Sequence, residues 1–234
     1  MESARAAQAG GAHRIELCSD LHSGGITPSG GLIAMVRKNV NLRLHVLIRP
    51  RPGDFVYSDD EFEVMKRDIL LARQLGANGI VLGILQASGE IDVMRTHELV
   101  ELTRPLPVTF HRAFDATPDF DKALEAVRQT GAVRILTSGG APDAATGIAT
   151  LARLVKQASE SLTILPGGGI RTSNVARILN ETKAREVHTS LQSSQPMADS
   201  RQAQFGAASK ALEPAEVAQF VQAVQMASEP GKTM

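Results

Sequence analysis

The sequence predicts an α/β protein built as a barrel of eight parallel strand–helix units, the TIM-type (β/α)8 barrel. Short runs of β-branched and apolar residues alternate with longer amphipathic stretches along the chain. The connections between them are short, which is typical of parallel strands joined by crossover helices. The strand candidates recur at intervals of roughly 20–35 residues, as in such barrels. The GxGxxG turn that often follows the first strand of an open, doubly wound sheet is absent.

Seven strands are readable in chain order from their short apolar runs, at residues 14–18, 44–48, 79–82, 108–111, 134–137, 162–165 and 186–189. The amphipathic pattern predicts helices at about 2–9, 29–40, 59–75, 92–103, 119–130, 143–158 and 173–180. Side chains that favour helix N-caps begin most of them: Ser29, Asp59, Asp92, Asp119, Asp143 and Ser173. Gly76 and Gly131 follow two of the helices, where a left-handed C-cap is expected.

The first strand of a complete barrel is missing from this count. The chain opens in the helix at 2–9, whereas each helix of such a barrel follows a strand. The strands at 14–18 and 186–189 would then each lack a neighbour and expose unpaired backbone groups. We therefore expect a form extended upstream by an apolar strand to melt at a higher temperature, unless the segment 191–212 or a second subunit covers the gap.

Residues 1–227 are expected to form a single barrel domain. The segment 191–212 is polar and rich in Gly and Ala, which indicates a long loop over the barrel mouth. Residues 213–227 indicate a final helix, and residues 228–234 a flexible tail.

Composition narrows the class of function. Hydrophobic residues make up 43% and charged residues 21% of the chain, as in globular proteins. The 25 Lys and Arg residues balance the 25 Asp and Glu residues, so no basic excess indicates a nucleic-acid partner. No apolar stretch is long enough to span a membrane, and the N-terminus lacks the apolar core of a signal peptide. With a single cysteine, these features favour a cytoplasmic protein.

Polar side chains are expected to converge at the C-terminal ends of the strands, where barrels of this class carry their chemistry. Strand alternation points Glu16, Arg49, His111 and His188 inward. We predict these four as catalytic residues, with Asp115 orienting His111 or balancing its charge. An internal salt-bridge network is the alternative, because buried charges are costly unless they are paired or functional.

Two features indicate that the site binds an anion. Arg51 and Arg112 lie in loops that follow strands, and guanidinium groups suit carboxylate or phosphate oxygens. Gly-rich turns after two consecutive strands expose backbone N–H groups; their residues are Ser138, Gly139, Gly140, Gly167, Gly168 and Gly169. The alternatives are a surface ion pair between Arg112 and Asp115, and glycines that serve only tight turns.

Five motifs that hold these residues follow one another along the chain. They are AGGAHRIELCSDLHSGGITPS, IRPRPGDFVYSDDE, LPVTFHRAFD, RILTSGG and PGGGI. In this order, from about residue 2 to 190, the chain resembles the CutC family, which is named for copper homeostasis. The resemblance implies a TIM-type barrel, a cytoplasmic location and a role in handling copper, and the family's usual first strand is missing here.

Copper(I) prefers thiolate and thioether ligands, and Cys18 is the one thiol in the chain. Cys18 is therefore predicted as a copper(I) ligand that needs His, Met or a second subunit to complete the site. Two functions remain open: a copper-handling protein, or a barrel enzyme acting on a small phosphate- or carboxylate-bearing substrate. A metal site of Glu16, His111 and His188 is a variant of the second. The expected partners are a small molecule or a metal ion, in a homo-oligomer.

Overall fold

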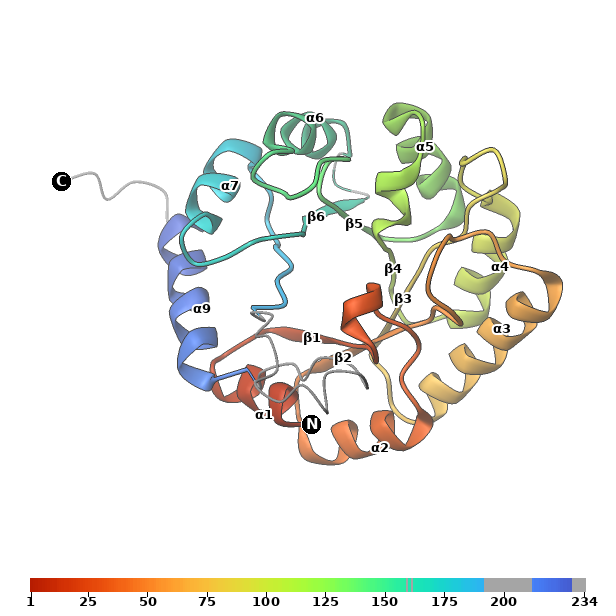
Figure 1. The fold of residues 1–234 in the computed structure, drawn as a ribbon, viewed down its shortest axis with the longest axis horizontal. Coiled ribbons are helices and arrows are strands. Elements are labelled where there is room, and N and C mark those ends of the chain that lie inside the picture. The colour runs from red at the N-terminus through yellow and green to blue at the C-terminus, as the bar shows by residue number, and fades with distance from the viewer. Residues whose placement is uncertain (159, 161, 192–211, 229–234) are drawn as a thin grey trace, which may run out of the picture.

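Six parallel strands form one curved sheet, and the helices lie on its outer side (Figure 1). This computed structural model describes residues 1–158, 160, 162–191 and 212–228. Within them each strand pairs in parallel with the next strand along the chain. The strands are β1 (Arg14–Leu17), β2 (Arg43–Leu47), β3 (Gly79–Leu82), β4 (Val108–Phe110), β5 (Arg134–Thr137) and β6 (Thr163–Pro166).

A helix follows each strand, and this strand–helix alternation around a curled sheet confirms the TIM-type barrel class. The α-helices are α1 (Glu2–Ala9), α2 (Gly30–Asn39), α3 (Asp59–Gln74), α4 (Val93–Thr103), α5 (Phe120–Thr130), α6 (Ile148–Ala158), α7 (Val175–Thr182) and α9 (Pro214–Ser228). Two short 3-10 helices, η1 (Leu21–Ser23) and η2 (Arg112–Ala116), follow β1 and β4.

The main hydrophobic core lies between the sheet and the helices. On β2, Leu44 and Val46 are buried in one cluster with Met65 and Ile69 of α3. Because successive strand residues face opposite sides of the sheet, His45 and Arg49 lie on the inner side of the barrel. The strand alternation predicted from the sequence therefore holds where it positions the candidate site.

The prediction of a strand at 186–189 is wrong. The segment runs beside β6, where the His188 amide donates to the Pro166 carbonyl at 2.8 Å, but it joins no ladder in the described part of the chain. That single bond is the only backbone hydrogen bond between the segment and β6 among the described residues, and a ladder needs a regular series of them. The described sheet therefore contains six strands rather than seven.

Side chains, instead of a ladder, hold this segment inside the barrel. The Glu186 carboxylate accepts from Arg14 at the start of β1, at 2.5 Å, and from Arg134 at the start of β5, at 3.0 Å. Burial alone would raise the pKa of Glu186, but the hydrogen bonds from the two arginines outweigh it and hold this pKa below its usual value. This ion cluster connects the two sides of the sheet near the N-terminal ends of the strands.

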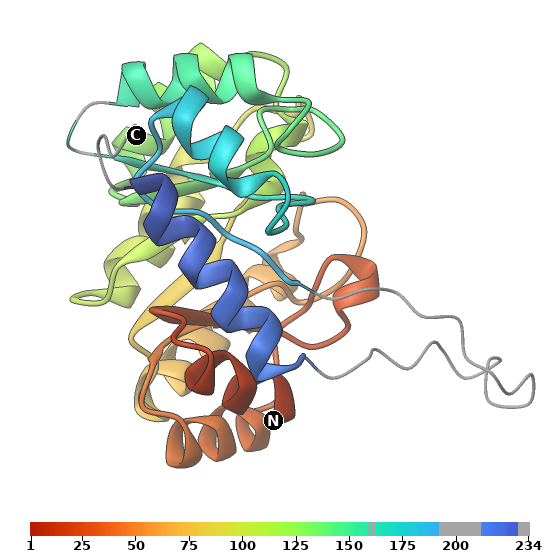
Figure 2. The ribbon, with the colours of Figure 1, turned by 90° about the vertical axis from the view of Figure 1, so that its left-hand side faces the viewer.

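Helix α9 covers the open side of the sheet and packs against α1 and α7 (Figure 2). Its Val217 and Phe220 are buried. Gly10, at the end of α1, lies so close that a Cβ atom there would come within 2.3 Å of the Val217 Cβ. A side chain at residue 10 would force the two helices apart.

The helix ends test the capping predictions. Ser29, Asp92 and Asp119 accept backbone N–H bonds as predicted, and Gly131 is a left-handed C-cap. The prediction of Asp59 as a cap is wrong, because Ser58 caps α3 in a reciprocal pair with Glu61. The predicted caps Asp143 and Ser173 are also wrong, because α6 begins only at Ile148 and α7 at Val175. Asp143 instead closes a turn by accepting from the Thr146 amide at 2.8 Å.

In the described part of the chain, no helix has the length and apolar character needed to cross a membrane. Most of the predicted loop at 191–212, and the predicted tail beyond Ser228, lie outside the described residues.

Candidate functional site

The predicted catalytic residues all lie toward the C-terminal ends of the strands. Glu16 is near the end of β1, Arg49 follows β2, and His111 follows β4 as the residue that caps η2. His188 lies opposite Pro166, the last residue of β6. The structure brings these residues together in pairs: Arg49 with His111, and Glu16 with His188.

Arg49 is buried at the barrel mouth, with only 5% of its surface exposed. Its guanidinium donates to the carbonyl oxygens of Ser23 and Gly25, both at 2.9 Å, and of Gly53 at 2.8 Å. The Arg49 Nε–H is buried and has no well-formed hydrogen bond to any residue that the structure describes. No carboxylate of the described residues forms an ion pair with Arg49; among them, carbonyl oxygens and the Phe55 ring face its positive charge.

His111 is also buried, with 6% of its surface exposed. Its Nδ1 accepts from the Ala113 amide at 3.2 Å, and its Nε2 is buried with no hydrogen-bond partner in the described part of the chain. Burial, and then the charge of Arg49, lowers the pKa of His111 to about 3. The ring is therefore neutral at pH 7.

Gly83, just beyond β3, makes room for the His111 ring. A Cβ atom at residue 83 would lie 2.5 Å from the His111 Nδ1, so the imidazole lies over the end of β3. β3 lies between β4, which His111 follows, and β2, which Arg49 follows. This position turns His111 toward Arg49. The sequence shows Gly83 only as a glycine after an apolar run, and that signal did not identify its role.

Two aromatic residues complete the surroundings of this pair, and the sequence analysis missed both. The Phe55 ring lies 5.0 Å from the Arg49 guanidinium carbon and 4.9 Å from the His111 ring. Tyr57 lies beside Arg49, and its buried hydroxyl has no well-formed hydrogen bond. Burial raises the pKa of Tyr57 to about 12, so the phenol stays protonated. In a chain with 3% aromatic residues, two aromatics next to the RPRPGD loop were the available signal.

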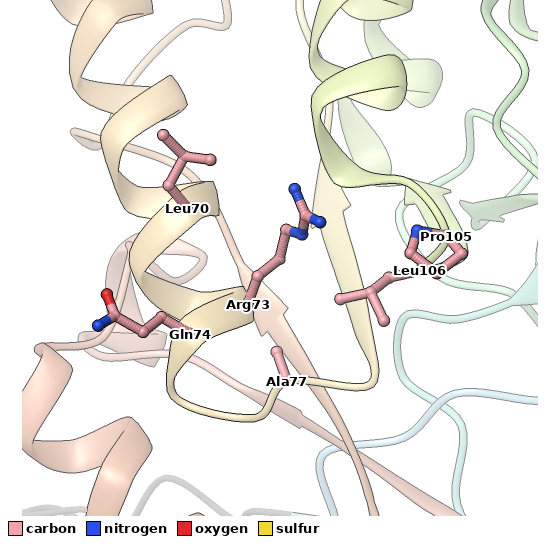
Figure 3. A pocket seen from close by; sticks show the side chains of 6 residues that line it. All are labelled: Leu70, Arg73, Gln74, Ala77, Pro105 and Leu106. Atoms are coloured by element: carbon pink, nitrogen blue, oxygen red, sulfur yellow. The ribbon is translucent and has the colours of Figure 1, made fainter.

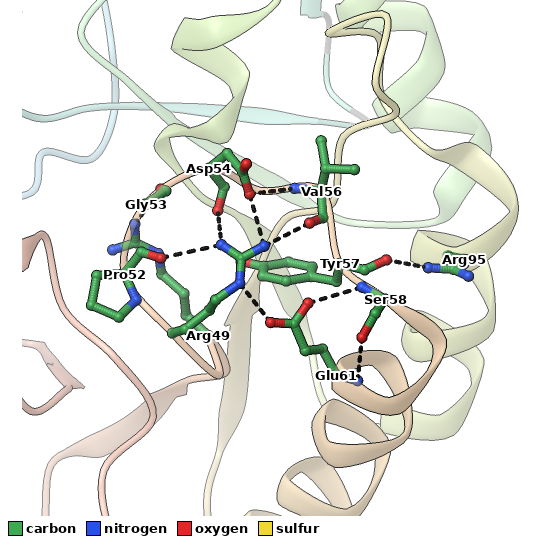
Figure 4. Close-up of polar contacts among 10 residues, drawn as sticks. Arg49, Pro52, Gly53, Asp54, Val56, Tyr57, Ser58, Glu61 and Arg95 are labelled. Carbon is green, nitrogen blue, oxygen red and sulfur yellow. Dashed lines mark hydrogen bonds and ion pairs between the residues drawn. The ribbon is translucent and has the colours of Figure 1, made fainter.

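Arg51 has a different environment from Arg49. It binds Glu61 at 2.5 Å and Asp54 at 2.9 Å, in the network around the start of α3 (Figure 4). It also donates to the Val56 carbonyl at 2.8 Å. Two carboxylates thus balance the charge of Arg51, and its predicted role in binding an anion stays a prediction.

Asp115 fixes the turn that follows β5. Its carboxylate accepts from the Thr137 hydroxyl, from the amides of Ser138 and Gly140, both at 3.1 Å, and from the Arg112 Nε at 2.7 Å. The turn through η2 directs Asp115 to these donors and not to His111, which it was predicted to orient. The protein's own carboxylate therefore occupies N–H groups that the sequence assigned to an external anion.

Arg112 connects the two Gly-rich turns. One of its terminal nitrogens donates to the Ser138 hydroxyl at 2.8 Å. The other lies 3.3 Å from the Cβ position of Gly168, whose φ of +96° favours glycine. The amide of Gly139 bonds to the Thr137 hydroxyl, and the amide of Gly167 to the Thr137 carbonyl. Anion binding by Gly168 and Gly169 stays a prediction.

Glu16 and His188 form the second predicted pair. The His188 Nδ1 lies 3.8 Å from a Glu16 carboxylate oxygen, at the distance limit of an ion pair and beyond a hydrogen bond. The Glu16 side chain is 19% exposed and that of His188 31% exposed, so water reaches both. An imidazole and a carboxylate in this arrangement can exchange a proton through one water molecule.

Cys18 lies just beyond β1 and is partly buried. Burial, followed by the charges of Glu16 and Asp20, raises the pKa of its thiol to about 11. Within the part of the chain that the structure describes, no three His, Cys, Asp or Glu side chains are grouped as metal ligands. Among these residues Glu16, His111 and His188 therefore do not come together as one metal site. The role of Cys18 as a copper(I) ligand stays a prediction.

A shallow groove of about 430 Å³ lies at the other end of the strands, where the chain enters β3 and β4 at their N-terminal ends (Figure 3). It is lined by Leu70, Arg73, Gln74, Ala77, Pro105 and Leu106. Arg73 donates to the Leu102 carbonyl at 2.6 Å. The groove contains none of the predicted site residues.

Comparison with known proteins places this geometry in a family. The model of the CutC family matches residues 1–193. The chain belongs to the CutC family. It is 48% identical to the family protein CutC of Chromobacterium violaceum over 190 residues, which is 81% of this chain and 77% of that protein. It is 49% identical to the human copper homeostasis protein cutC homolog over 193 residues, or 82% and 71% of the two chains.

A solved structure agrees with this assignment. The putative copper homeostasis protein CutC from Streptococcus agalactiae matches with a TM-score of 0.72 and 36% identity, over 75% of this chain and 87% of that one. The CutC assignment and barrel class inferred from the sequence motifs are thus confirmed. The catalytic roles of the individual residues stay predictions.

Proposed function

We propose that this CutC-family chain binds a small molecule with an anionic group at the C-terminal ends of its strands. Its human and mouse relatives are named copper homeostasis proteins, and binding of this molecule would be its contribution to copper homeostasis. The observation that carries the proposal is the buried Arg49 guanidinium, which has no carboxylate partner among the described residues. A buried cation is costly without a compensating anion, and a ligand carboxylate or phosphate would supply it.

The other residues of the mouth support a reaction as well as binding. His111 adds an unpartnered N–H group beside Arg49, and the water-exposed Glu16–His188 pair could move a proton. A barrel enzyme on a small anionic substrate is thus the function that the geometry favours. Direct coordination of copper(I) is the second candidate, and only the family name supports it.

Calorimetric titration with oxalate and with inorganic phosphate tests the anion site. We expect saturable binding of at least one anion, weakened at least tenfold by Arg49→Gln and unchanged by Arg51→Gln. The Arg51 variant is a matched control, because two carboxylates of the protein already balance Arg51. Since Arg49 also ties three loop carbonyls, Arg49→Lys gives a second variant that keeps the charge. Equal binding by the protein and by both Arg49 variants would refute the proposal.

Copper(I) competition with a chromophoric chelator tests the second candidate. We expect weak binding that Cys18→Ser leaves unchanged. Tight binding lost in Cys18→Ser would favour copper handling over the enzyme. We also propose a cytoplasmic location and a homo-oligomer, which cell fractionation and sedimentation velocity would check.

A further inference from the structure

We infer that His111 is a fixed neutral hydrogen-bond donor, whose Nε2–H acts with the Arg49 Nε–H to bind an oxygen atom of the ligand. The ligand class is a carboxylate or carbonyl compound whose oxygen carries negative charge, in the substrate or as the reaction proceeds. This inference rests on the proposed anion site and deepens it, because it assigns the donors. It also removes His111 from the candidates for a general base.

The tautomer follows from the local backbone. The Ala113 amide can only donate, so Nδ1 of His111 must accept, and the ring proton lies on Nε2. A doubly protonated ring would bring two donors together at Nδ1. Arg49 is the charged group that shifts this ring, and its positive charge disfavours a second proton.

The position of the ring is also fixed. His111 caps η2, its backbone amide donates to the Leu82 carbonyl at 2.8 Å, and its ring lies over Gly83. Phe55 and Phe110 lie 4.9 Å and 6.1 Å from it, centroid to centroid. A donor held in this way needs no reorganisation when a ligand oxygen arrives, which is the condition for electrostatic stabilisation of developing charge.

The unpaired donors identify the missing group as an acceptor. Buried N–H groups are nearly always hydrogen-bonded, and an orphaned one indicates an unseen partner. Among the described residues the His111 Nε2, the Arg49 Nε and the neighbouring Tyr57 hydroxyl are buried without a well-formed hydrogen bond, and the first two groups contact the Phe55 ring. An oxygen atom satisfies such donors, whereas a metal ion would need His111 to present a lone pair at Nε2.

Nitrogen-15 NMR of the imidazole tests the tautomer without any ligand. We expect His111 to show the Nε2–H tautomer throughout pH 5 to 8. An Nδ1–H tautomer, or a doubly protonated ring at pH 7, would overturn this inference and leave the anion site standing.

Oxalate binding by two His111 variants tests the donor. His111→Asn keeps an acceptor for the Ala113 amide but lacks a donor at the Nε2 position, and we expect it to bind oxalate at least tenfold more weakly. His111→Gln restores an N–H near that position, so it should bind within about threefold of the original protein. If His111 served only to cap η2, His111→Asn would bind normally, and that result would overturn the inference.

Gly83→Ala gives an independent test, since its Cβ would displace the His111 ring. We expect it to weaken oxalate binding at least fivefold. Gly31→Ala is the matched control, because the nearest atom to its Cβ is 3.9 Å away. Unchanged binding in Gly83→Ala would count against the position of the donor. An original protein that binds no oxalate at all would refute the inference for carboxylates, whereas the anion site would fail only if phosphate binding were absent too.

Discussion

Acidification should destabilise this protein well before its carboxylates titrate, because two histidines are buried as neutral rings. Burial, followed by the charges of Arg14 and Arg134, lowers the pKa of His45 to about 4. The pKa of His111 is lowered to about 3. In the unfolded chain both rings take up a proton near pH 6.5. As the pH falls below this value the unfolded chain binds more protons than the folded one, so stability is lost.

The size of the loss follows from these pKa values. Between pH 7 and pH 5 each ring costs about 2 kcal/mol, since one unit of pKa difference corresponds to roughly 1.4 kcal/mol. Together the two rings remove about 4 kcal/mol, a large share of the roughly 5–15 kcal/mol by which domains are stable. The loss continues until the pH falls below about 4 for His45 and about 3 for His111.

Urea unfolding at half-unit steps from pH 7.5 to 5 measures this loss. The free energy of unfolding should fall with a slope that approaches two protons. His45→Gln should reduce the slope by one proton, and so should His111→Asn, whatever either variant does to stability at pH 7. Slopes are compared because the remaining histidines are common to all forms. A slope that neither substitution changes would refute the assignment of neutral, buried rings.

Three further outcomes are expected. Asp115→Asn should lower the free energy of unfolding by about 2–4 kcal/mol, because it places an N–H among the donors of the 137–140 turn, whereas Asp121→Asn at an exposed ion pair should change it far less. Glu186→Gln should cost about 1–3 kcal/mol in urea unfolding, against well under 1 kcal/mol for Glu181→Gln on the surface of α7. Cys18 should react with a disulfide reagent at pH 8 at least roughly tenfold more slowly than free glutathione, because its pKa of about 11 leaves little thiolate, and Cys18→Ser should fold.

The sequence predicted the barrel and its helices well because each depends on local patterns. The apolar run at 79–82 coincides with β3, and the helix at 2–9 coincides with α1. The run at 186–189 has the same apolar character, but it makes only one backbone hydrogen bond to β6 among the described residues. Whether a run forms a regular ladder depends on its position beside the sheet, which a local pattern does not contain. Glu186 forms ion pairs with Arg14 of β1 and Arg134 of β5. The sequence pattern placed Glu186 in a strand and did not predict these ion pairs.

In the candidate site, too, the local pattern predicted which way a side chain points but not which residues it contacts. Strand alternation correctly placed Arg49 on the inner side of the barrel, because side-chain direction repeats every two residues. Arg51, two residues later in the same loop, looked equivalent but pairs with Glu61 on the following helix. Arg51 has carboxylate partners, and Arg49 has none among the described residues. This difference depends on contacts between elements, which follow from the fold and not from the motif.

Gly79, the first residue of β3, and Gly83, just beyond its end, explain why the barrel interior can hold two histidines from the strands on either side of β3. Gly79 faces the His45 ring and Gly83 faces the His111 ring, and in each case a Cβ atom would come within 2.6 Å of the imidazole. Because they are four residues apart, both glycines lie on the same face of the chain. The His45 ring lies near the ion cluster of Glu186, Arg14 and Arg134. The His111 ring lies beside Arg49, and its Nε2 has no partner among the described residues. The two rings are alike in burial and in charge state. The neighbours of each ring are therefore the reason why we propose that a ligand binds beside His111 and not beside His45.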